Sequence, residues 1–386
     1  MPVADVVVVG AGVAGASIAF QLASRKAGRV LVLERDQAGH GNSGQSSALV
    51  RMHYSFPGEV ELALRSLELF RSWEDVVGRP GHLTVTGFVN LVGPRHVEAL
   101  RANVAMQRAL GADTRLISLE ELGEMEPDWV LDDVGGAAFE PGSGYGDGSS
   151  TAGDFLAAAR ERGASYRAGV RVTSLRVEAG RVRGVATSAG PVESPVVVLA
   201  CGAWSRPLLA DAGCDLPIET ELHRVALLQN PPALRGRGLA CIDHAIARYY
   251  RRESGDLTLV GDFFGERGVA PDAFRAASTA PELLAGLIEP LVRRVPKLAD
   301  AGIFRGVAGV YDMTPDERPL LGPVPGLEGL FVAAGFSGMG YKISPAVGMV
   351  LAEQILDGRA TSVDARPFRP ERFAEGDPIR AAHEYD

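Results

Sequence analysis

Two glycine-rich turns, one near each end of the chain, carry the clearest chemical signal in the sequence. The first reads Gly-Ala-Gly-Val-Ala-Gly at residues 10–15, directly after a run of valines. Glycines at this spacing permit a tight turn, the close approach of a pyrophosphate and close packing of the following helix. An acidic residue ends the next apolar run, where a carboxylate can bind a ribose hydroxyl. The segment therefore predicts a dinucleotide site whose contacts are Gly10, Gly12, Val13, Ala14, Gly15, Glu34 and Arg35.

The second turn, at residues 335–340, follows the apolar run at 329–334. Its successive glycines let backbone amides approach a planar ring or an anion, and the helix expected to start near Pro345 points its N-terminus at the same place. Lys342 stands beside this turn, although only three of the 39 basic residues are lysines. Packing alone is the alternative explanation, but the spacing and the rare lysine favour a second ligand-binding loop.

A loop of small polar residues bears on the kind of dinucleotide. Residues 41–47 read Gly-Asn-Ser-Gly-Gln-Ser-Ser, whereas an NAD dehydrogenase usually continues with plain alternation of strands and helices. Such groups can line a pyrophosphate and a flavin, which favours FAD over NAD; a solvated connection is the alternative. The candidate contacts in this loop are Ser43, Gly44, Gln45 and Ser46.

The elements that position these turns follow a parallel α/β pattern. A strand at 4–9, a helix at 13–24 and a strand at 29–33 form a βαβ unit, because the pattern changes from a continuous apolar run to a helical period. The apolar runs at 195–200 and 329–334 can join the same sheet. The intervening segments have a different character, with mixed strands and helices, and the tail after Asp364 reads as a solvated extension.

We therefore predict an α/β fold in which a discontinuous Rossmann-type FAD-binding domain is interleaved with an α+β substrate domain built on an antiparallel sheet. The FAD-binding domain is expected to comprise residues 1–81, 142–214 and 311–386. The substrate domain is expected to comprise residues 82–141 and 215–310.

Bulk composition excludes several classes of function. A net charge of -9 argues against a nucleic-acid partner, because such proteins cluster Lys and Arg. Three cysteines without a close pair argue against a redox disulfide or a metal site. The start of the chain lacks the pattern of a secretory signal and no apolar run is long enough to span a bilayer, so we expect a cytoplasmic enzyme.

Several further motifs resemble the D-amino-acid-oxidase superfamily of FAD enzymes, and the chain looks most similar to its sarcosine oxidase group, which includes the β subunit of heterotetrameric sarcosine oxidase and related glycine, proline and opine oxidoreductases. The resemblance runs from the first glycine turn nearly to the end of the chain. It rests on Arg-Met-His-Tyr at 51–54, Ala-Leu-Arg-Ser at 63–66, Tyr-Asp-Met-Thr-Pro-Asp at 311–316, Pro-Leu-Leu-Gly at 319–322 and the loop ending in Lys342.

The resemblance implies a substrate held over the flavin, with its carboxylate bound by Arg51 and Lys342. An arginine fork and an ammonium suit a carboxylate. Tyr249 and Tyr250 match an aromatic wall of the pocket, and His53 and His244 are candidates for polar roles near the flavin, although such aromatic and histidine residues are often structural. The further cofactor contacts that it implies are Val172, Cys201, Gly202, Trp204, Gly309, Gly335, Gly338, Met339, Gly340, Tyr341 and Lys342.

Two departures from the family pattern bear on the flavin. Members with a cysteine-linked flavin carry that cysteine where this chain has Gly309, and the alternative histidine attachment meets Gln45 and Ser46. FAD is therefore expected to be noncovalent. Monomeric sarcosine oxidases also carry a lysine that promotes the reaction with dioxygen, whereas this chain has only Arg248, Arg251 and Arg252 in that region. Oxidase and dehydrogenase activities both stay open.

The expected function is FAD-dependent oxidation of the C–N bond of a small amino acid or an N-methyl or cyclic amino acid, similar to sarcosine. Hydride transfer would give an imine that water hydrolyses, and the electrons would pass to dioxygen or to an electron-accepting partner protein. One alternative is a dehydrogenase subunit of a hetero-oligomer; a homo-oligomer is equally open. Another is a flavin-binding tailoring protein that acts on a substrate other than an amino acid.

Overall fold

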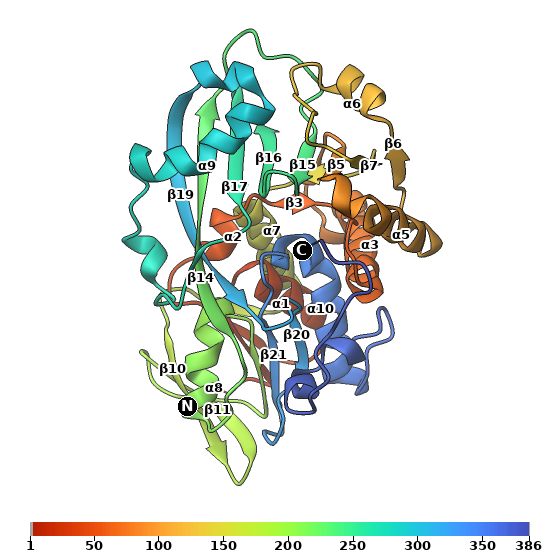
Figure 1. Cartoon of the computed structure of the whole chain (residues 1–386). Helices are drawn as coiled ribbons and strands as arrows, with labels where there is room; N and C mark the ends of the chain where they lie inside the picture. The colour runs from red at the N-terminus through yellow and green to blue at the C-terminus, as the bar shows by residue number, and fades with distance from the viewer. Residues whose placement is uncertain (1–2, 386) are drawn as a thin grey trace.

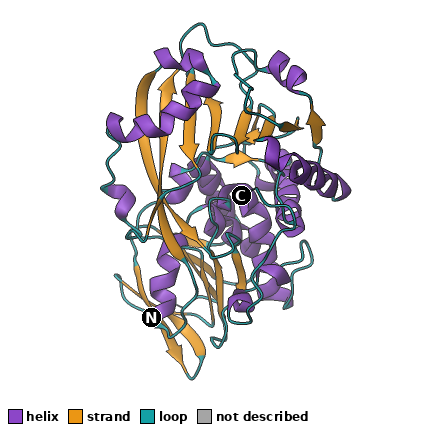
Figure 2. Ribbon diagram, in the orientation of Figure 1, coloured by secondary structure: helices purple, strands orange, loops and turns teal. Residues whose placement is uncertain are grey.

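The computed structural model describes residues 3–385 and is built on two large β-sheets (Figure 1). One is a six-stranded sheet in the lower half of the view, and the other is a nine-stranded sheet in the upper half. Figure 2 shows that helices flank both sheets. The α/β class with an interleaved antiparallel sheet is thus confirmed.

The first sheet has the order β20-β21-β13-β1-β2-β9, and all its pairings are parallel except β20 with β21. Its inner strands are continuous apolar runs because both faces are covered. The predicted βαβ unit and the return of the run at 195–200 to this sheet are confirmed. The strands are β1 (Val6–Val9), β2 (Val30–Leu33), β9 (Ser165–Arg167), β13 (Val196–Leu199), β20 (Leu320–Pro323) and β21 (Leu330–Ala334).

Helices pack on one face of this sheet, and a three-stranded antiparallel sheet with a short helix covers the other face. The covering helices are α1 (Val13–Ser24), α7 (Gly148–Glu161), α10 (Gly340–Asp357), α3 (Pro57–Arg71) and α4 (Trp73–Val77). The opposite face carries β10 (Val172–Glu178), β11 (Arg181–Thr187), β12 (Val192–Glu193) and α8 (Ser205–Asp211).

The second large sheet is antiparallel except for one parallel pairing, β5 with β15. Apolar residues of α9 (Pro281–Arg294) pack on one of its faces, and α5 (Val97–Ala109) and α6 (Leu119–Met125) lie at its other end. Its strands are β5 (Phe88–Val92), β6 (Arg115–Ile117), β7 (Gly136–Glu140), β14 (Glu219–Gln229), β15 (Ala240–Asp243), β16 (Arg248–Glu253), β17 (Leu257–Asp262), β18 (Glu266–Arg267) and β19 (Gly302–Met313).

Three short strands join the two halves of the fold: β3 (Leu49–Val50), β4 (Thr84–Val85) and β8 (Gly144–Tyr145). Each large sheet draws its strands from separate stretches of sequence. We propose that the domain boundaries follow the segments expected from the sequence. β19 alone runs past such a boundary, because its last three residues stay paired with β14. No helix among residues 3–385 is long and apolar enough to cross a membrane.

The helix after the second glycine turn starts earlier than predicted. α10 begins at Gly340 rather than near Pro345. Pro345 lacks an N–H group and leaves the carbonyl of Tyr341 free, but the Ser344 hydroxyl donates to that carbonyl at 2.8 Å. The helix therefore tolerates an internal proline, and Lys342 lies in its first turn.

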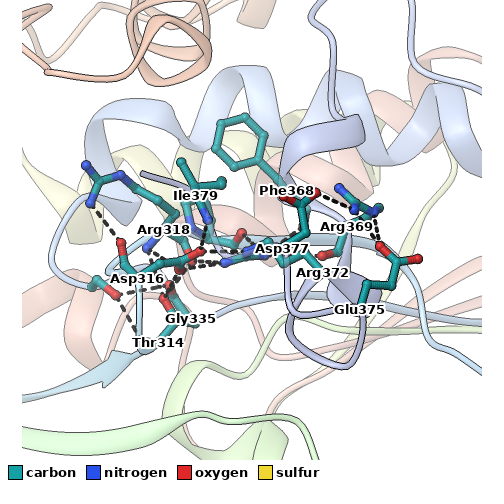
Figure 3. A network of polar contacts seen from close by, with 12 residues as sticks. Thr314, Asp316, Arg318, Gly335, Phe368, Arg369, Arg372, Glu375, Asp377 and Ile379 are labelled. Carbon is teal, nitrogen blue, oxygen red and sulfur yellow. Dashed lines mark hydrogen bonds and ion pairs between the residues drawn. The ribbon is translucent and has the colours of Figure 1, made fainter. Parts of the chain in front are cut away.

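The prediction of a solvated tail after Asp364 is wrong. Phe368 and Arg372 are fully buried, and Arg372 forms two 2.8 Å bonds with the carboxylate of Asp316 (Figure 3). The same carboxylate accepts a hydrogen bond from the backbone N–H of Ile379 at 2.9 Å. The acidic end of the Tyr-x-x-Thr-Pro-Asp motif thus anchors the C-terminal segment, which returns to the middle of the molecule (Figure 1).

Candidate functional site

A cavity of about 490 Å³ lies at the carboxyl ends of strands of the parallel sheet. Ligands of open α/β sheets bind at this edge. Residues from both glycine turns line the cavity, and so does Asp272, which follows β18 of the nine-stranded sheet. The predicted cofactor contacts that line it are Gly10, Gly12, Val13, Ala14, Glu34, Arg35, Ser43, Ser46, Val172, Cys201, Gly202, Trp204, Gly338, Gly340 and Tyr341.

The first glycine turn leaves no room for side chains. Gly10 has a φ of +101°, and a Cβ atom there would lie 2.5 Å from the carbonyl oxygen of Ala200. A Cβ atom on Gly15 would lie 2.0 Å from the carbonyl oxygen of Gly10. Gly15 thus packs against the turn, behind the residues that line the cavity. The amide-rich start of α1 is thereby open to an anion, as a bound pyrophosphate requires.

Polar groups fix the loops on either side of this turn. The Glu34 carboxylate accepts hydrogen bonds from the backbone N–H groups of Ala11 and Asp36, each at 2.9 Å. The Ser43 hydroxyl accepts from the N–H of Val13 at 3.0 Å. Glu34 and Ser43 therefore hold the end of β2 and the loop at 41–47 against the first glycine turn. Their assignment to the cofactor site requires this.

An ion pair between two distant segments forms another wall of the cavity. The Arg35 guanidinium lies 4.1 Å from the centre of the Trp204 ring and forms a bidentate pair with Asp272 at 2.6 and 3.0 Å. Trp204 Nε1 also donates to Asp272 at 3.2 Å. These hydrogen bonds help to lower the pKa of Asp272 to about 2, against the effect of its partial burial. Asp272 follows β18, so a segment next to the nine-stranded sheet contributes to this cavity.

The second glycine turn is held by the motif that ends β19. Asp312 accepts a hydrogen bond from the N–H of Gly335 at 2.7 Å, and burial raises the pKa of Asp312 to about 6. The ring of Tyr311 packs against Gly338, where a Cβ atom would lie 2.8 Å from it. Tyr311 and Asp312 both line the cavity. Tyr-x-x-Thr-Pro-Asp thus positions the glycine loop beside the cavity.

Gly309 and Gln45, positions at which the sequence resemblance would allow a covalent flavin, lie side by side. Asn42, at the start of α2 (Asn42–Gln45), pairs through its amide with both the N–H and the C=O of Val310. A Cβ atom on Gly309 would consequently lie 3.3 Å from the Cβ of Gln45. Neither glycine nor glutamine supplies a nucleophile at this point. Gly309 and Gln45 do not themselves line the cavity.

Other predicted cofactor contacts also lie behind the residues that line the cavity. Lys342, Gly335 and Met339 belong to the loop and helix that position it, and a Cβ atom on Gly335 would lie 2.5 Å from Thr314. Gly44 lies against the carbonyl of Gly39, 2.7 Å from where its Cβ would be. These residues shape the cavity wall through close backbone packing.

Two cations, the partly exposed Arg51 and the buried Lys342, lie close enough for the charge of Arg51 to act on Lys342. Lys342 is 7% exposed, and its nearest hydrogen-bond acceptor is the carbonyl of Gly338 at 3.4 Å. Burial lowers the pKa of Lys342 well below its usual range, and the charge of Arg51 lowers it further. Within residues 3–385, neither cation has a carboxylate within salt-bridge distance. Both are therefore able to receive an anion.

The backbone around Arg51 is fixed by a buried carboxylate. Glu140 accepts hydrogen bonds from the N–H of Met52 at 2.9 Å and from Ser143 at 2.7 Å, and burial raises the pKa of Glu140 to about 7. Arg51 donates to the carbonyl of His53, and its guanidinium lies 4.2 Å from the centre of the Tyr54 ring. These contacts fix the orientation of the Arg51 side chain, which directly follows β3.

The adjacent tyrosines on β16 face opposite sides of the sheet. Tyr249 is hydrogen-bonded to the cavity residue Tyr311, and burial raises the pKa of both hydroxyls. Tyr250 lies in the core behind the sheet, 5.2 Å from the ring of Trp129 and 3.4 Å from Asp243. Alternation of side chains along a strand requires this separation. The structure thus brings Tyr249, and not Tyr250, towards the cavity.

The two histidines, of which His53 is buried and His244 is partly exposed, are neutral. Burial lowers the pKa of His53 well below its usual range, and burial together with Arg51 and His96 lowers that of His244 to about 3. His244 Nε2 lies 3.3 Å from the amide oxygen of Asn90. Both imidazoles are therefore suited to hydrogen bonding rather than to carrying charge.

The three arginines in the region of the oxidase lysine are engaged elsewhere. Arg248 donates to carbonyls of α9, and Arg252 donates to the carbonyl of Arg235. Arg251 donates to the carbonyl of Ser47 at 2.8 Å and pairs with Glu253 at 2.8 Å. Their contacts are structural ones within the described chain.

Three features define a dinucleotide-binding α/β protein: the first glycine turn, the acidic residue at the end of β2 and the cavity at the edge of the sheet. The family of FAD dependent oxidoreductases known as DAO matches residues 5–354, and the chain belongs to that family. This confirms the resemblance found in the motifs.

Individual relatives cover nearly the whole chain. Mitochondrial sarcosine dehydrogenase of Homo sapiens is 28% identical over 98% of this chain, which spans 41% of that protein. Glycine oxidase of Geobacillus kaustophilus is 28% identical over 94% of this chain and 96% of its own length. The crystal structure of L-proline dehydrogenase from P. horikoshii superposes with a TM-score of 0.90 and 27% identity, covering 98% of this chain and all of that one.

The residues present fit FAD. The amide-rich start of α1 suits the pyrophosphate, Glu34 stands where a ribose hydroxyl is bound, and the glycine loop at 335–340 lets a planar ring approach the backbone. Several lining residues were not among the predicted contacts; some come from segments without a local motif, whereas Asn42, Tyr311 and Asp312 lie in motifs recognised in the sequence. They include Asp36, His40, Asn42, Arg171, Thr173, Asp272, Tyr311 and Asp312. For the last two, their place in the Tyr-x-x-Thr-Pro-Asp motif was the available signal.

Replacing Gly15 with alanine should remove FAD and destabilise the fold. The new methyl group would clash with the carbonyl of Gly10, and overpacking of this kind costs about 1–3 kcal/mol in free energy of unfolding. Gly153→Ala is the matched control, since a Cβ atom there meets nothing within 4 Å, and it should change stability by less than about 1 kcal/mol. Flavin absorbance per chain and thermal unfolding measure both effects. Full flavin content in Gly15→Ala would contradict the assignment.

Proposed function

We propose that this protein oxidises the C–N bond of a small amino acid, or of an N-methyl or cyclic amino acid similar to sarcosine. The observation that carries the proposal is that neither Arg51 nor Lys342 has a carboxylate partner among residues 3–385, although Lys342 and the Arg51 Nε atom are buried. Removing a charge from water is costly unless an opposite charge compensates for it. A substrate carboxylate is the partner that such a pair favours.

The two cations would orient the substrate through different contacts. Arg51 presents a planar fork with an unpartnered, buried Nε atom, and Lys342 presents a point charge from the first turn of α10. Charge-assisted hydrogen bonds of this kind contribute about 1.5–3 kcal/mol each. Together they would fix the carboxylate and so aim the neighbouring C–H bond at the glycine loop.

The surroundings favour a neutral amine. The rings of Tyr54 and Phe88 lie 4.2 and 5.9 Å from the Arg51 guanidinium, and His53 and His244 are neutral. Burial and nearby positive charge both disfavour a protonated amine, which carries no lone pair. When bound, FAD supplies the hydride acceptor for this chemistry. The resulting imine would then be hydrolysed by water.

We propose that FAD is held noncovalently, because Gly309 occupies the cysteine position and Gln45 and Ser46 occupy the histidine position. Acid precipitation of the purified protein should leave all yellow colour in the supernatant. Flavin that stays with the precipitate after washing would contradict this expectation and would direct attention to another nucleophile in the lining.

The proposal is tested by the visible spectrum of the purified flavoprotein. The protein is mixed without oxygen with sarcosine, dimethylglycine, proline, glycine and D-amino acids, and is then exposed to air. Bleaching by one of these compounds supports the proposal. Rapid recovery in air would indicate an oxidase, whereas slow recovery would indicate a dehydrogenase that passes electrons to a partner protein. A flavin that stays oxidised with every compound would contradict the proposal and favour a substrate other than an amino acid.

A further inference from the structure

Tyr385, near the end of the described chain, lies in the neighbourhood of Arg51. Its hydroxyl is 2.8 Å from His53 Nε2. Its ring packs against the rings of His53 and His244, with centroids 5.9 and 4.5 Å apart. Because Arg51 donates to the carbonyl of His53, direct contacts lead from this cation to the C-terminal segment.

The segment at 379–385 is held in place by residues that are distant in the sequence. The bonds join it to α5 and to the turn between β19 and β20, so its position is set by distant parts of the chain rather than by local structure. The bonds are Ile379 N to Asp316 Oδ2 at 2.9 Å, Asn103 Nδ2 to the carbonyl of His383 at 2.8 Å, and Arg318 Nη2 to Glu384 Oε1 at 2.8 Å.

Buried hydrogen-bond donors without partners lie in the same neighbourhood. Arg51 Nε and Asn90 Nδ2 have no hydrogen-bond acceptor in the part of the chain that the structure describes, and Asn90 is only 1% exposed. The other end of the Asn90 amide faces His244, on which the ring of Tyr385 packs. Buried polar groups normally have partners. Two such donors therefore favour a ligand with acceptor oxygens bound between Arg51 and Tyr385.

The wall that faces these donors is uncharged. Burial raises the pKa of Tyr385 to about 12, and His53 and His244 are neutral as well. Tyr385 also packs on the apolar cluster that contains Val92 and Leu100. A bulky, neutral ring in this position limits the space beside the cations without competing for the carboxylate.

We propose that the Tyr385 ring, held in place by the segment at 379–385, is a wall of the substrate site and limits the size of the group carried by the substrate. This inference rests on the proposed function. It assigns a specificity-determining role to a segment whose polar sequence suggested a solvated tail.

The test compares Tyr385→Ala and Tyr385→Leu with Arg380→Ala, an exposed control on the same segment. The probes are acetate and benzoate, which a flavoprotein of this type cannot oxidise at a C–N bond, and their dissociation constants are read from perturbation of the flavin spectrum. Tyr385→Ala should strengthen benzoate binding relative to acetate by about tenfold, a typical effect of removing a steric limit in a pocket. Arg380→Ala should keep the wild-type ratio.

Tyr385→Leu retains the apolar contacts with Val92 and Leu100, so it covers the case in which the alanine variant fails to fold. It should shift the benzoate-to-acetate ratio in the same direction by a smaller factor. A wild-type ratio in a folded, flavin-loaded Tyr385 variant would overturn the inference while leaving the proposed function intact. If wild-type protein binds neither acid and no amino acid bleaches its flavin, the proposed function fails, and the inference fails with it.

Discussion

Lys342→Met should stabilise the protein and disable it at the same time. The folded state holds this ammonium in a buried site without a carboxylate partner, and its pKa is lowered there, so folding disfavours the charged form that the unfolded chain prefers. Replacing a buried charged group with an apolar one can raise the free energy of unfolding by about 1–4 kcal/mol. Loss of one charge-assisted bond to the substrate should lower kcat/KM by about 10- to 150-fold.

Denaturant unfolding and steady-state kinetics measure these two changes. Lys26→Met is the matched control, because Lys26 is exposed, and it should change stability by less than about 0.5 kcal/mol. Flavin content should stay unchanged in both variants, since neither side chain lines the cavity. A destabilised Lys342→Met variant with wild-type kinetics would show that the lysine has a structural role.

The pH dependence of carboxylate binding should report the same group. A carboxylate prefers protonated Lys342, whose pKa in the free protein is lowered by burial and by Arg51. Binding is therefore tightest below that pKa and weakens above it, by up to about tenfold per pH unit, because a proton must then be taken up. In Lys342→Met this dependence should disappear.

Arg372→Met should produce the largest loss of stability among the expected changes. The guanidinium is fully buried and pairs with Asp316 through two 2.8 Å bonds, and it also donates to backbone carbonyls at 319 and 368 (Figure 3). Removing one partner of a buried pair leaves an uncompensated charge and costs about 3–5 kcal/mol. Thermal and denaturant unfolding of the flavin-loaded protein measure this loss.

Arg369→Met is the matched control, because Arg369 pairs with Glu375 and Asp377 at the surface. It should cost at most about 1 kcal/mol. The pair with Arg372 lowers the pKa of Asp316, so its contribution is present above the ordinary aspartate pKa of 3.8 and is lost as the pH falls through the folded value. The difference between wild type and Arg372→Met should therefore shrink in acid. Equal costs for the two variants would contradict the role of this pair.

The nucleotide-binding part of the fold could be predicted from the sequence because its signals are local. Valine runs, glycines at fixed spacing and a helical period all lie within residues 4–34, and β1, α1 and β2 follow them. The second glycine turn was equally visible. Its helix started earlier than expected because Ser344 replaces the hydrogen bond that Pro345 cannot make.

The missed features depend on contacts between distant segments. Asp272 reaches the cavity through a pair with Arg35, 237 residues away, and no motif marks Asp272. The sequence of the C-terminal segment is polar, which suggests exposure to solvent. In the fold, however, Arg372 forms an ion pair with Asp316, and Glu384 forms one with Arg318. Tyr250 was grouped with Tyr249 although neighbours on a strand face opposite sides. Such pairings become visible only when the sheets are assembled.

The central claim, that Arg51 and Lys342 together hold a substrate carboxylate, is tested most directly by a crystal structure of the FAD-loaded protein with benzoate. We expect the benzoate carboxylate oxygens to lie about 3 Å from the Arg51 guanidinium and from Lys342 Nζ, with the benzoate ring on the side of Tyr385. Benzoate bound away from both cations, or a protein carboxylate paired with Lys342 in that structure, would contradict it.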